Sequence, residues 1–227
     1  MPAASDAALR LAGVRAAIDR AAASTSRRGD EIELIAISKT FDADAIAPLI
    51  AAGQRAFGEN RVQEAQAKWP PLLATTPDIR LHLVGQLQSN KAAEAVALFD
   101  VIHAVDRPSL ITALGKAMDA AGRRRDCYLQ VNIGEEVQKG GCAIADVPAL
   151  LAAAQAAGVP IIGLMAVPPA ATEAAPFFAL LQKLARDAGL AGFNAGLSMG
   201  MSGDFETAVM MGATTVRVGS ALFGGRS

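Results

Sequence analysis

A single lysine follows an apolar segment near the beginning of the chain. Lys39 comes directly after residues 32–38 and shares its side-chain alternation with Ile35 and Ile37. If that face points into the fold, the amine is partly shielded from water and is freed for Schiff-base formation with a carbonyl compound. The alternative is a lysine that extends from the end of a strand into solvent. Spacing alone leaves both interpretations open.

Two turns rich in glycine and serine lie towards the end of the sequence. Ser202 and Gly203 belong to the first turn, which precedes a helix expected to begin near Asp204, and Gly219 and Ser220 belong to the second. Small residues let backbone N–H groups approach an anion, and helix N-termini favour negative charge. The two turns together favour a phosphate site over ordinary turn chemistry.

Arg217 interrupts the β-rich segment 215–219, where it alternates with Val216 and Val218. If the valines pack against outer helices, the guanidinium points into the interior. A buried charge without a partner is very costly, so the guanidinium needs an acceptor there. The acceptor is either a ligand or a structural carboxylate, and the sequence alone slightly favours the carboxylate.

Short β-rich segments alternate with helix-like segments from end to end, after an N-terminal helix that carries Leu11, Val14 and Ile18 on one face. The expected strands cover residues 32–38, 55–58, 81–85, 101–105, 128–133, 161–166, 196–199 and 215–219. The expected helices between them cover residues 43–52, 62–73, 90–99, 109–121, 147–157, 177–188 and 205–211. N-caps are expected at Ser109 and Asp204. This alternation predicts a parallel α/β sheet, and eight units close a (β/α)8 barrel of the TIM type.

An open doubly wound sheet is the alternative architecture. It is disfavoured because no G-x-G-x-x-G motif follows the first strand and the sequence contains no P-loop motif. With no linker or shift in composition, we expect one domain over residues 1–227. Active sites of such barrels lie at the C-terminal ends of the strands, where Lys39, Arg217 and the two turns would meet.

Composition restricts the classes of partner. Apolar residues make up 52% of the 227 residues, and the net charge of −1 gives no electrostatic case for nucleic acid or an anionic membrane. The mean hydropathy is +0.31, but the longest apolar tract, residues 143–171, is broken by residues such as Asp146 and Pro160, so no membrane span is expected. Cys127 and Cys142 do not have zinc-ligand spacing, and no metal is expected. Without an apolar leader at the N-terminus, a cytoplasmic location is expected.

Over the segments that carry Lys39, Arg217 and the two turns, the chain resembles the pyridoxal phosphate homeostasis protein family. The matching segments are 36–40 (AISKT), 57–64 (FGENRVQE), 82–91 (HLVGQLQSNK), 163–166 (GLMA), 197–202 (LSMGMS), 204–206 (DFE) and 216–219 (VRVG). They occur in order at barrel spacing, and their combination is specific although no single segment is. The resemblance implies the fold of the barrel domain of alanine racemase and a pyridoxal 5'-phosphate (PLP) cofactor. Arg61, where the family often has an aromatic residue, puts only loop details in doubt.

The resemblance also implies a set of PLP-binding residues. They are Ile37, Lys39, Asn60, Met165, Ser198, Ser202, Arg217, Gly219 and Ser220. Lys39 would carry PLP as a Schiff base, the two turns would hold the phosphate, and Arg217 would face the pyridine nitrogen. Asn60 and Met165 would line the pocket of the ring.

The sequence favours a carrier of PLP over an enzyme that turns over a substrate. Arginine only donates hydrogen bonds, so a pyridine nitrogen bonded to Arg217 stays unprotonated and is a weaker electron sink. A two-base racemase needs a second acid or base, but Tyr128 is expected near the start of the fifth strand, away from Lys39. His103 is an unsupported candidate for that base, and a structural histidine is favoured. Because the sequence ends at Ser227, we also expect no β domain of the kind with which alanine racemases close their site.

We therefore expect a PLP homeostasis or carrier protein, with PLP-dependent apo-enzymes as candidate recipients and a monomeric or weakly dimeric state. A fold-type III amino-acid racemase-like enzyme is the alternative. A third reading is a phosphate-binding barrel for another metabolite, with Lys39 as a catalytic lysine.

Overall fold

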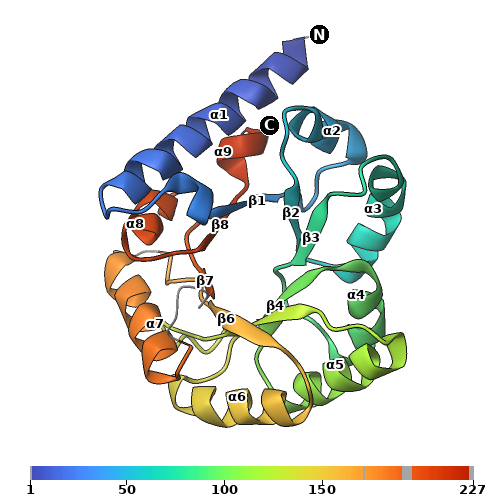
Figure 1. Ribbon diagram of the computed structural model, residues 1–227, viewed down its shortest axis with the longest axis vertical. Helices are drawn as coiled ribbons and strands as arrows, with labels where there is room; N and C mark the ends of the chain where they lie inside the picture. Colours follow the sequence, from blue (N-terminus) through green and yellow to red (C-terminus); the bar gives the residue numbers. More distant parts are fainter. Residues whose placement is uncertain (1, 171, 191–195, 225–227) are drawn as a thin grey trace.

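The structure is a computed structural model that describes residues 2–170, 172–190 and 196–224. Over this part of the chain, eight parallel strands form a closed barrel in sequence order, as predicted (Figure 1). The strands are β1 (Glu33–Ile37), β2 (Ala56–Glu59), β3 (Arg80–Leu83), β4 (Val101–Val105), β5 (Asp126–Gln130), β6 (Ile161–Met165), β7 (Gly196–Ser198) and β8 (Thr215–Val218). The barrel closes where β1 pairs with β8, with Ile35 opposite Arg217.

Helices surround the barrel (Figure 1). They are α1 (Pro2–Ala23), α2 (Ala43–Ala51), α3 (Val62–Thr75), α4 (Ala92–Leu98), α5 (Pro108–Ala121), α6 (Val147–Ala156), α7 (Ala175–Asp187), α8 (Phe205–Met210) and α9 (Ser220–Phe223). The expected N-terminal helix, α1, packs against α2, α8 and α9. Arg10 in α1 donates a hydrogen bond to the carbonyl oxygen of Leu222 at 2.6 Å, which ties the beginning of the chain to its end.

Alternation along each strand separates two sets of side chains. Val216 and Val218 are fully buried in the main apolar core, between the strands and the helices. Residues of opposite alternation point into the barrel, where Tyr128 and Met165 belong to a second, smaller cluster. Arg217 has this inward alternation and is only 4% exposed. Its predicted inward orientation is confirmed.

Two glycines on neighbouring strands allow close packing inside the barrel. A Cβ atom on Gly196 would lie 2.6 Å from Cε1 of Tyr128, and one on Gly163 would lie 1.9 Å from the carbonyl oxygen of Gly196. Side chains are therefore excluded at these two positions of β6 and β7. Gly196 makes room for the ring of Tyr128, which is 4% exposed, and Gly163 makes room for the backbone of Gly196.

Most predicted boundaries are shifted by one or two residues, and two differences have a clear physical reason. The fifth strand was expected over 128–133 but spans Asp126–Gln130, because the chain bends after Val131, which only forms an isolated bridge to Cys142. Helix α5 begins at Pro108 with Arg107 as its N-cap, not with Ser109. Proline is well suited to the first helical position because its fixed φ is helical and its missing N–H is not needed there.

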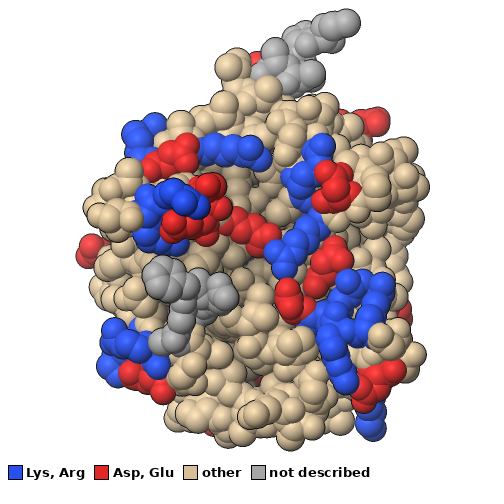
Figure 2. Space-filling model, viewed as in Figure 1, with Lys and Arg blue, Asp and Glu red and all other residues tan. Residues whose placement is uncertain are grey.

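Acidic and basic side chains lie next to one another over the face seen in Figure 2. Among the helices that the structure describes, none combines the length and apolar character needed to cross a membrane. The described residues also contain no cluster of three or more His, Cys, Asp and Glu side chains suited to a metal ion. Both cysteines are free and buried.

Candidate functional site

A cavity of about 380 Å³ lies at the C-terminal ends of β1, β7 and β8. It is lined by Ile37, Lys39, Phe41, Met201, Ser202, Gly203, Arg217, Gly219, Ser220 and Gly224. The structure thus brings Lys39, Arg217 and both Gly/Ser turns to one opening of the barrel. Lys39 is partly exposed there, so its amine is accessible to a ligand.

The turn that carries Lys39 is held from behind by a buried ion pair. Lys68 Nζ, on α3, donates hydrogen bonds to the carbonyl oxygens of Ser38 at 2.9 Å and Phe41 at 2.8 Å. The same nitrogen lies 2.7 Å from Oε1 of Glu59, at the end of β2. The Lys68 side chain is 8% exposed and that of Glu59 is fully buried. The pair therefore fixes the backbone on both sides of Lys39.

Further contacts make this turn rigid. The Ser38 hydroxyl donates to Oε1 of Glu59 at 2.6 Å, and the Trp69 indole N–H donates to the same oxygen at 3.0 Å. Thr40 has a φ of 67°, and its backbone N–H donates to Oε1 of Glu64 at 2.5 Å. Few non-glycine residues adopt a positive φ, so this bond offsets a local strain. Sequence reasoning missed these residues; the i,i+4 spacing of Glu64 and Lys68 was the available signal.

Arg217 faces the same cavity from β8. Its Nη1 donates to the Ser198 hydroxyl at 2.6 Å and its Nη2 to the carbonyl oxygen of Ala166 at 2.9 Å. Burial lowers the pKa of the guanidinium to about 10, so it remains charged near neutral pH. In the described part of the chain these bonds go to a hydroxyl and a carbonyl group, not to the carboxylate expected for a structural salt bridge. A guanidinium has five N–H donors, which leaves donors for a ligand in the cavity.

Ser202 links the two Gly/Ser turns. Its hydroxyl oxygen accepts hydrogen bonds from the backbone N–H groups of Gly219 at 3.2 Å and Ala221 at 3.5 Å. Open space borders the turns, because a Cβ on Gly203 would meet no atom within 4 Å and one on Gly219 only Ile37, at 3.5 Å or more. Backbone amides beside open space, with two cationic side chains nearby, suit an anionic group.

The remaining predicted residues lie elsewhere. Asn60 and Met165 line a separate cavity of about 280 Å³, together with residues such as Gln130 and Lys139. Ser198 is fully buried beneath Arg217 and so lies behind the cavity wall. The nine predicted residues therefore do not all surround one cavity, and direct contacts from these three to PLP remain predictions.

A larger cavity, of about 760 Å³, lies on the outside of the barrel against α6 and the end of α7. Arg124 and Asp187 are among its lining residues, but most of its wall is alanine, leucine, proline and glycine. Among the described residues no lysine lines it, so they offer it no amine for Schiff-base chemistry. The Lys39 cavity is the candidate site because of the side chains that line it, although it is the smaller of the two cavities.

The chain is similar to known proteins over nearly its whole length. The family model described as alanine racemase, N-terminal domain, matches residues 11–227. A pyridoxal phosphate homeostasis protein of Pseudomonas aeruginosa is 42% identical over 220 residues, covering 95% of this chain and 94% of its own length. Its counterpart of the same name in Escherichia coli is 39% identical over 230 residues and covers 97% of each chain.

Solved structures agree with these relatives. PipY of Synechococcus elongatus PCC7942, with PLP bound, has a TM-score of 0.82 and 40% identity, covering 96% of this chain and 100% of that one. Alanine racemase of Corynebacterium glutamicum has a TM-score of 0.69 at 20% identity, and the match spans 98% of this chain but 61% of the racemase. The latter likeness concerns the fold alone. The chain belongs to the pyridoxal phosphate homeostasis protein family, as its motifs predicted.

Proposed function

We propose that this chain binds PLP through Lys39 and acts in PLP homeostasis as a carrier of the cofactor. One observation carries the proposal: Lys39, Arg217 and the two Gly/Ser turns surround one cavity. PLP has an aldehyde, a pyridine nitrogen and a phosphate. The amine, the guanidinium and the backbone amides of the turns match these three groups in kind.

Each residue has a definite role in this proposal. The Lys39 amine forms the covalent link as a Schiff base, and Ser202, Gly219 and Ser220 hold the phosphate. Arg217 donates to the pyridine nitrogen, and Ile37 contacts the ring from β1. Asn60 and Met165 extend the ring pocket from the second cavity, and Ser198 acts through Arg217. The names of the relatives and the PLP-bound PipY structure support this assignment.

Carriage is favoured over turnover by what surrounds the cavity. Arg217 cannot protonate the pyridine nitrogen, which limits the stabilisation of a carbanion. The Tyr128 hydroxyl lies inside the barrel, 3.2 Å from Oγ1 of Thr215, and His103 is fully buried. Neither is among the residues that line the Lys39 cavity, so neither is placed as a second base.

The proposal includes PLP-dependent apo-enzymes as recipients, a cytoplasmic location, and a monomeric or weakly dimeric state. The two free, buried cysteines are consistent with a reducing compartment.

Delivery of the cofactor tests the proposed function. The PLP-loaded chain is mixed with the apo-form of a PLP-dependent enzyme, and recovery of that enzyme's activity is followed beside an equal concentration of free PLP. We expect the loaded chain to activate the enzyme, and to do so when a phosphatase that destroys free PLP is present. Loss of all activation in the presence of the phosphatase would contradict carriage.

An amino-acid racemase-like activity would give a different result. It predicts exchange of the α-proton of an amino acid in deuterated water, dependent on Lys39 and well above the rate with free PLP. We expect no such exchange across a broad panel of amino acids.

A further inference from the structure

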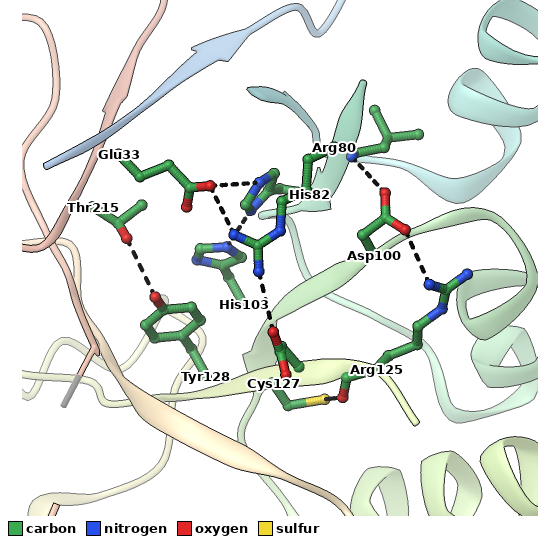
Figure 3. Close-up of polar contacts among 11 residues, drawn as sticks. Glu33, Arg80, His82, Asp100, His103, Arg125, Cys127, Tyr128 and Thr215 are labelled. Carbon is green, nitrogen blue, oxygen red and sulfur yellow. Dashed lines mark hydrogen bonds and ion pairs between the residues drawn. The ribbon is translucent and has the colours of Figure 1, made fainter. Parts of the chain in front are cut away.

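A chain of polar contacts crosses the interior of the barrel beneath the Lys39 cavity. The Ser198 hydroxyl oxygen lies 2.6 Å from Nη1 of Arg217 and 2.9 Å from Nδ1 of His103. Nε2 of His103 lies 3.0 Å from Nδ1 of His82, and Nε2 of His82 lies 3.6 Å from Oε1 of Glu33. We refer to these five residues as the interior relay. Figure 3 shows its end from His103 to Glu33.

The relay joins the two openings of the barrel. Arg217 lines the cavity at the C-terminal ends of the strands, whereas Glu33 is the first residue of β1, at the opposite end. The Glu33 side chain is 27% exposed and also pairs with Arg80 at 2.8 Å (Figure 3). The charged ends of the relay are therefore a cation at the site and a carboxylate near solvent at the far opening.

The middle of the relay is closed to water. His82, His103 and Ser198 are fully buried. Burial lowers the pKa of His82 to about 3 and that of His103 well below its usual range, and the guanidinium of Arg80 acts in the same direction on both. Both imidazoles are therefore neutral near pH 7, and each has one donor and one acceptor nitrogen.

One direction of hydrogen bonding satisfies the buried groups of the relay from Arg217 to Nδ1 of His82, and within the described residues it leaves only Nε2–H of His82 without a hydrogen-bond acceptor. Arg217 can only donate, so Ser198 accepts from it and its own proton is free to donate to Nδ1 of His103. His103 then carries its proton on Nε2 and donates to Nδ1 of His82. The His82 proton is consequently on Nε2, directed at the Glu33 carboxylate. At 3.6 Å this last contact is longer than a hydrogen bond, so it acts as an electrostatic attraction.

The opposite direction leaves a mismatch at each end. His103 would donate from Nδ1 to Ser198, which already accepts from Arg217, and the hydroxyl proton would lose its acceptor among the relay residues. At the other end, the unprotonated Nε2 of His82 would face the Glu33 carboxylate, so that two acceptors would oppose each other. Buried polar groups without partners are costly, and both mismatches disfavour this direction.

The ring of His103 is also fixed by its neighbours. Tyr128 stacks on it with ring centroids 4.4 Å apart and planes 17° apart, and the Tyr128 hydroxyl lies 3.2 Å from Oγ1 of Thr215. A flip of the His103 ring about its Cβ–Cγ bond would put a carbon in place of each nitrogen, and the ring would have to displace its stacked neighbour to turn. The direction of the relay therefore depends on where the protons sit, not on reorientation of the ring.

We propose that His82, His103 and Ser198 form a one-directional hydrogen-bond relay that positions Arg217 for the pyridine nitrogen of PLP, and that Glu33 sets the direction of this relay from the far opening. The part that concerns PLP rests on the proposed function. These four are positioning residues, since each acts through Arg217. A change at Glu33 therefore alters the position of Arg217 at the cofactor site, although Glu33 and the site lie at opposite ends of the barrel.

Nitrogen-15 NMR of the histidine rings tests the relay without any cofactor. The sequence contains only two histidines, so labelling with ring-¹⁵N histidine reports on His82 and His103 alone. We expect both rings to be neutral at pH 7 with the proton on Nε2, which gives two protonated Nε2 and two unprotonated Nδ1 signals. A proton on Nδ1 of either ring, or a charged imidazolium, would overturn the relay.

A matched pair of variants tests the role of Glu33. Glu33 and Asp126 each pair with Arg80, at 2.8 and 3.1 Å, but only Glu33 faces His82. In Glu33→Gln the amide group can donate to Nε2 of His82, so we expect a loss of the single tautomer at both rings together, because they are coupled. Asp126→Asn removes the other carboxylate from Arg80 and is expected to leave both tautomers as in the natural chain.

The outcomes distinguish a role of Glu33 in setting the hydrogen-bond direction of the relay from a role in packing alone. If Glu33→Gln leaves both tautomers unchanged, or if Asp126→Asn changes them equally, Glu33 does not set the direction and the proposal fails. A role in packing alone would lower stability in both variants without a concerted change of tautomer.

A second readout concerns the cofactor. After PLP is bound, Glu33→Gln is expected to shift the absorption band of the bound cofactor, and Asp126→Asn is expected to leave it in place. An unshifted band in a Glu33→Gln protein whose tautomers have changed would overturn the positioning role. Failure of the chain to bind PLP would instead overturn the proposed function, and the NMR result would still decide the relay.

Discussion

The buried ion pair behind Lys39 gives a quantitative prediction. In Lys68→Met, a side chain of similar length keeps its packing but loses the ammonium group that bonds to Ser38, Phe41 and Glu59. The Glu59 carboxylate, which is fully buried, is then left without its counter-charge. Breaking a buried pair from one side costs about 3–5 kcal/mol. That is a large fraction of a typical folding free energy of about 5–15 kcal/mol.

This cost translates into a measurable shift of the melting temperature. The entropy of unfolding is about 2.1 cal/mol/K per residue, or about 0.5 kcal/mol/K for this chain. The expected loss is therefore about 6–10 °C in Tm, measured by calorimetry, with a matching decrease in the urea midpoint. Lys183→Met is the control, because Lys183 forms an i,i+4 pair with Asp187 in which both side chains are at least half exposed. Such exposed pairs contribute little to stability, so its Tm should change by about 1 °C or less.

A double variant separates the unpaired charge from the lost contacts. Glu59→Gln combined with Lys68→Met removes both charges, so we expect it to be more stable than Lys68→Met alone. A Lys68→Met protein within 1 °C of the natural chain, or no more affected than Lys183→Met, would refute the assignment of a buried, paired Lys68.

Three further predictions concern the site and the interior histidines. Lys39→Ala is expected to abolish the covalent link to PLP but to retain weaker binding in equilibrium dialysis, because the proposed phosphate contacts are mostly with backbone groups; equal loss of both would contradict the role of the two turns. Arg217→Ala should still form the link but change the absorption of bound PLP and its pH dependence, and an unchanged spectrum would count against the contact with the ring nitrogen. Folding stability should fall as the pH decreases below about 6.5, because the pKa of His82 is about 3 in the fold and 6.5 in the ordinary state, so protons bind preferentially to the unfolded chain. Each histidine contributes at most about 1.4 kcal/mol per pH unit in this range, and urea midpoints that do not vary between pH 7 and 5 would show that the imidazoles are not buried in neutral form.

The sequence was sufficient to predict the barrel, because alternation within each strand and the order of strands and helices can be recognised in short segments of the chain. Alternation in β1 and β8 predicted which residues point inward, and the structure places Lys39 and Arg217 at one cavity. The fifth strand was misplaced because Val131 and Ile133 are apolar and buried although they lie outside a strand. An apolar run indicates burial more reliably than it indicates the backbone conformation.

The supporting residues were not predictable, because they depend on how neighbouring elements are oriented against one another. Lys68 reaches Glu59 only because α3 is rotated to place that face against the end of β2. His82 and His103 meet because β3 and β4 are neighbours in a particular register, with His82 opposite Val101. Sequence spacing specifies neither the rotation of a helix nor the register between neighbouring strands.

Identifying the lysine that holds the cofactor tests the central claim most directly. The chain is incubated with PLP, the link is reduced with borohydride, and the protein is digested and mapped by mass spectrometry. We expect a pyridoxyl adduct on the peptide that contains Lys39. An adduct on another lysine, or no adduct under conditions where PLP is bound, would contradict it.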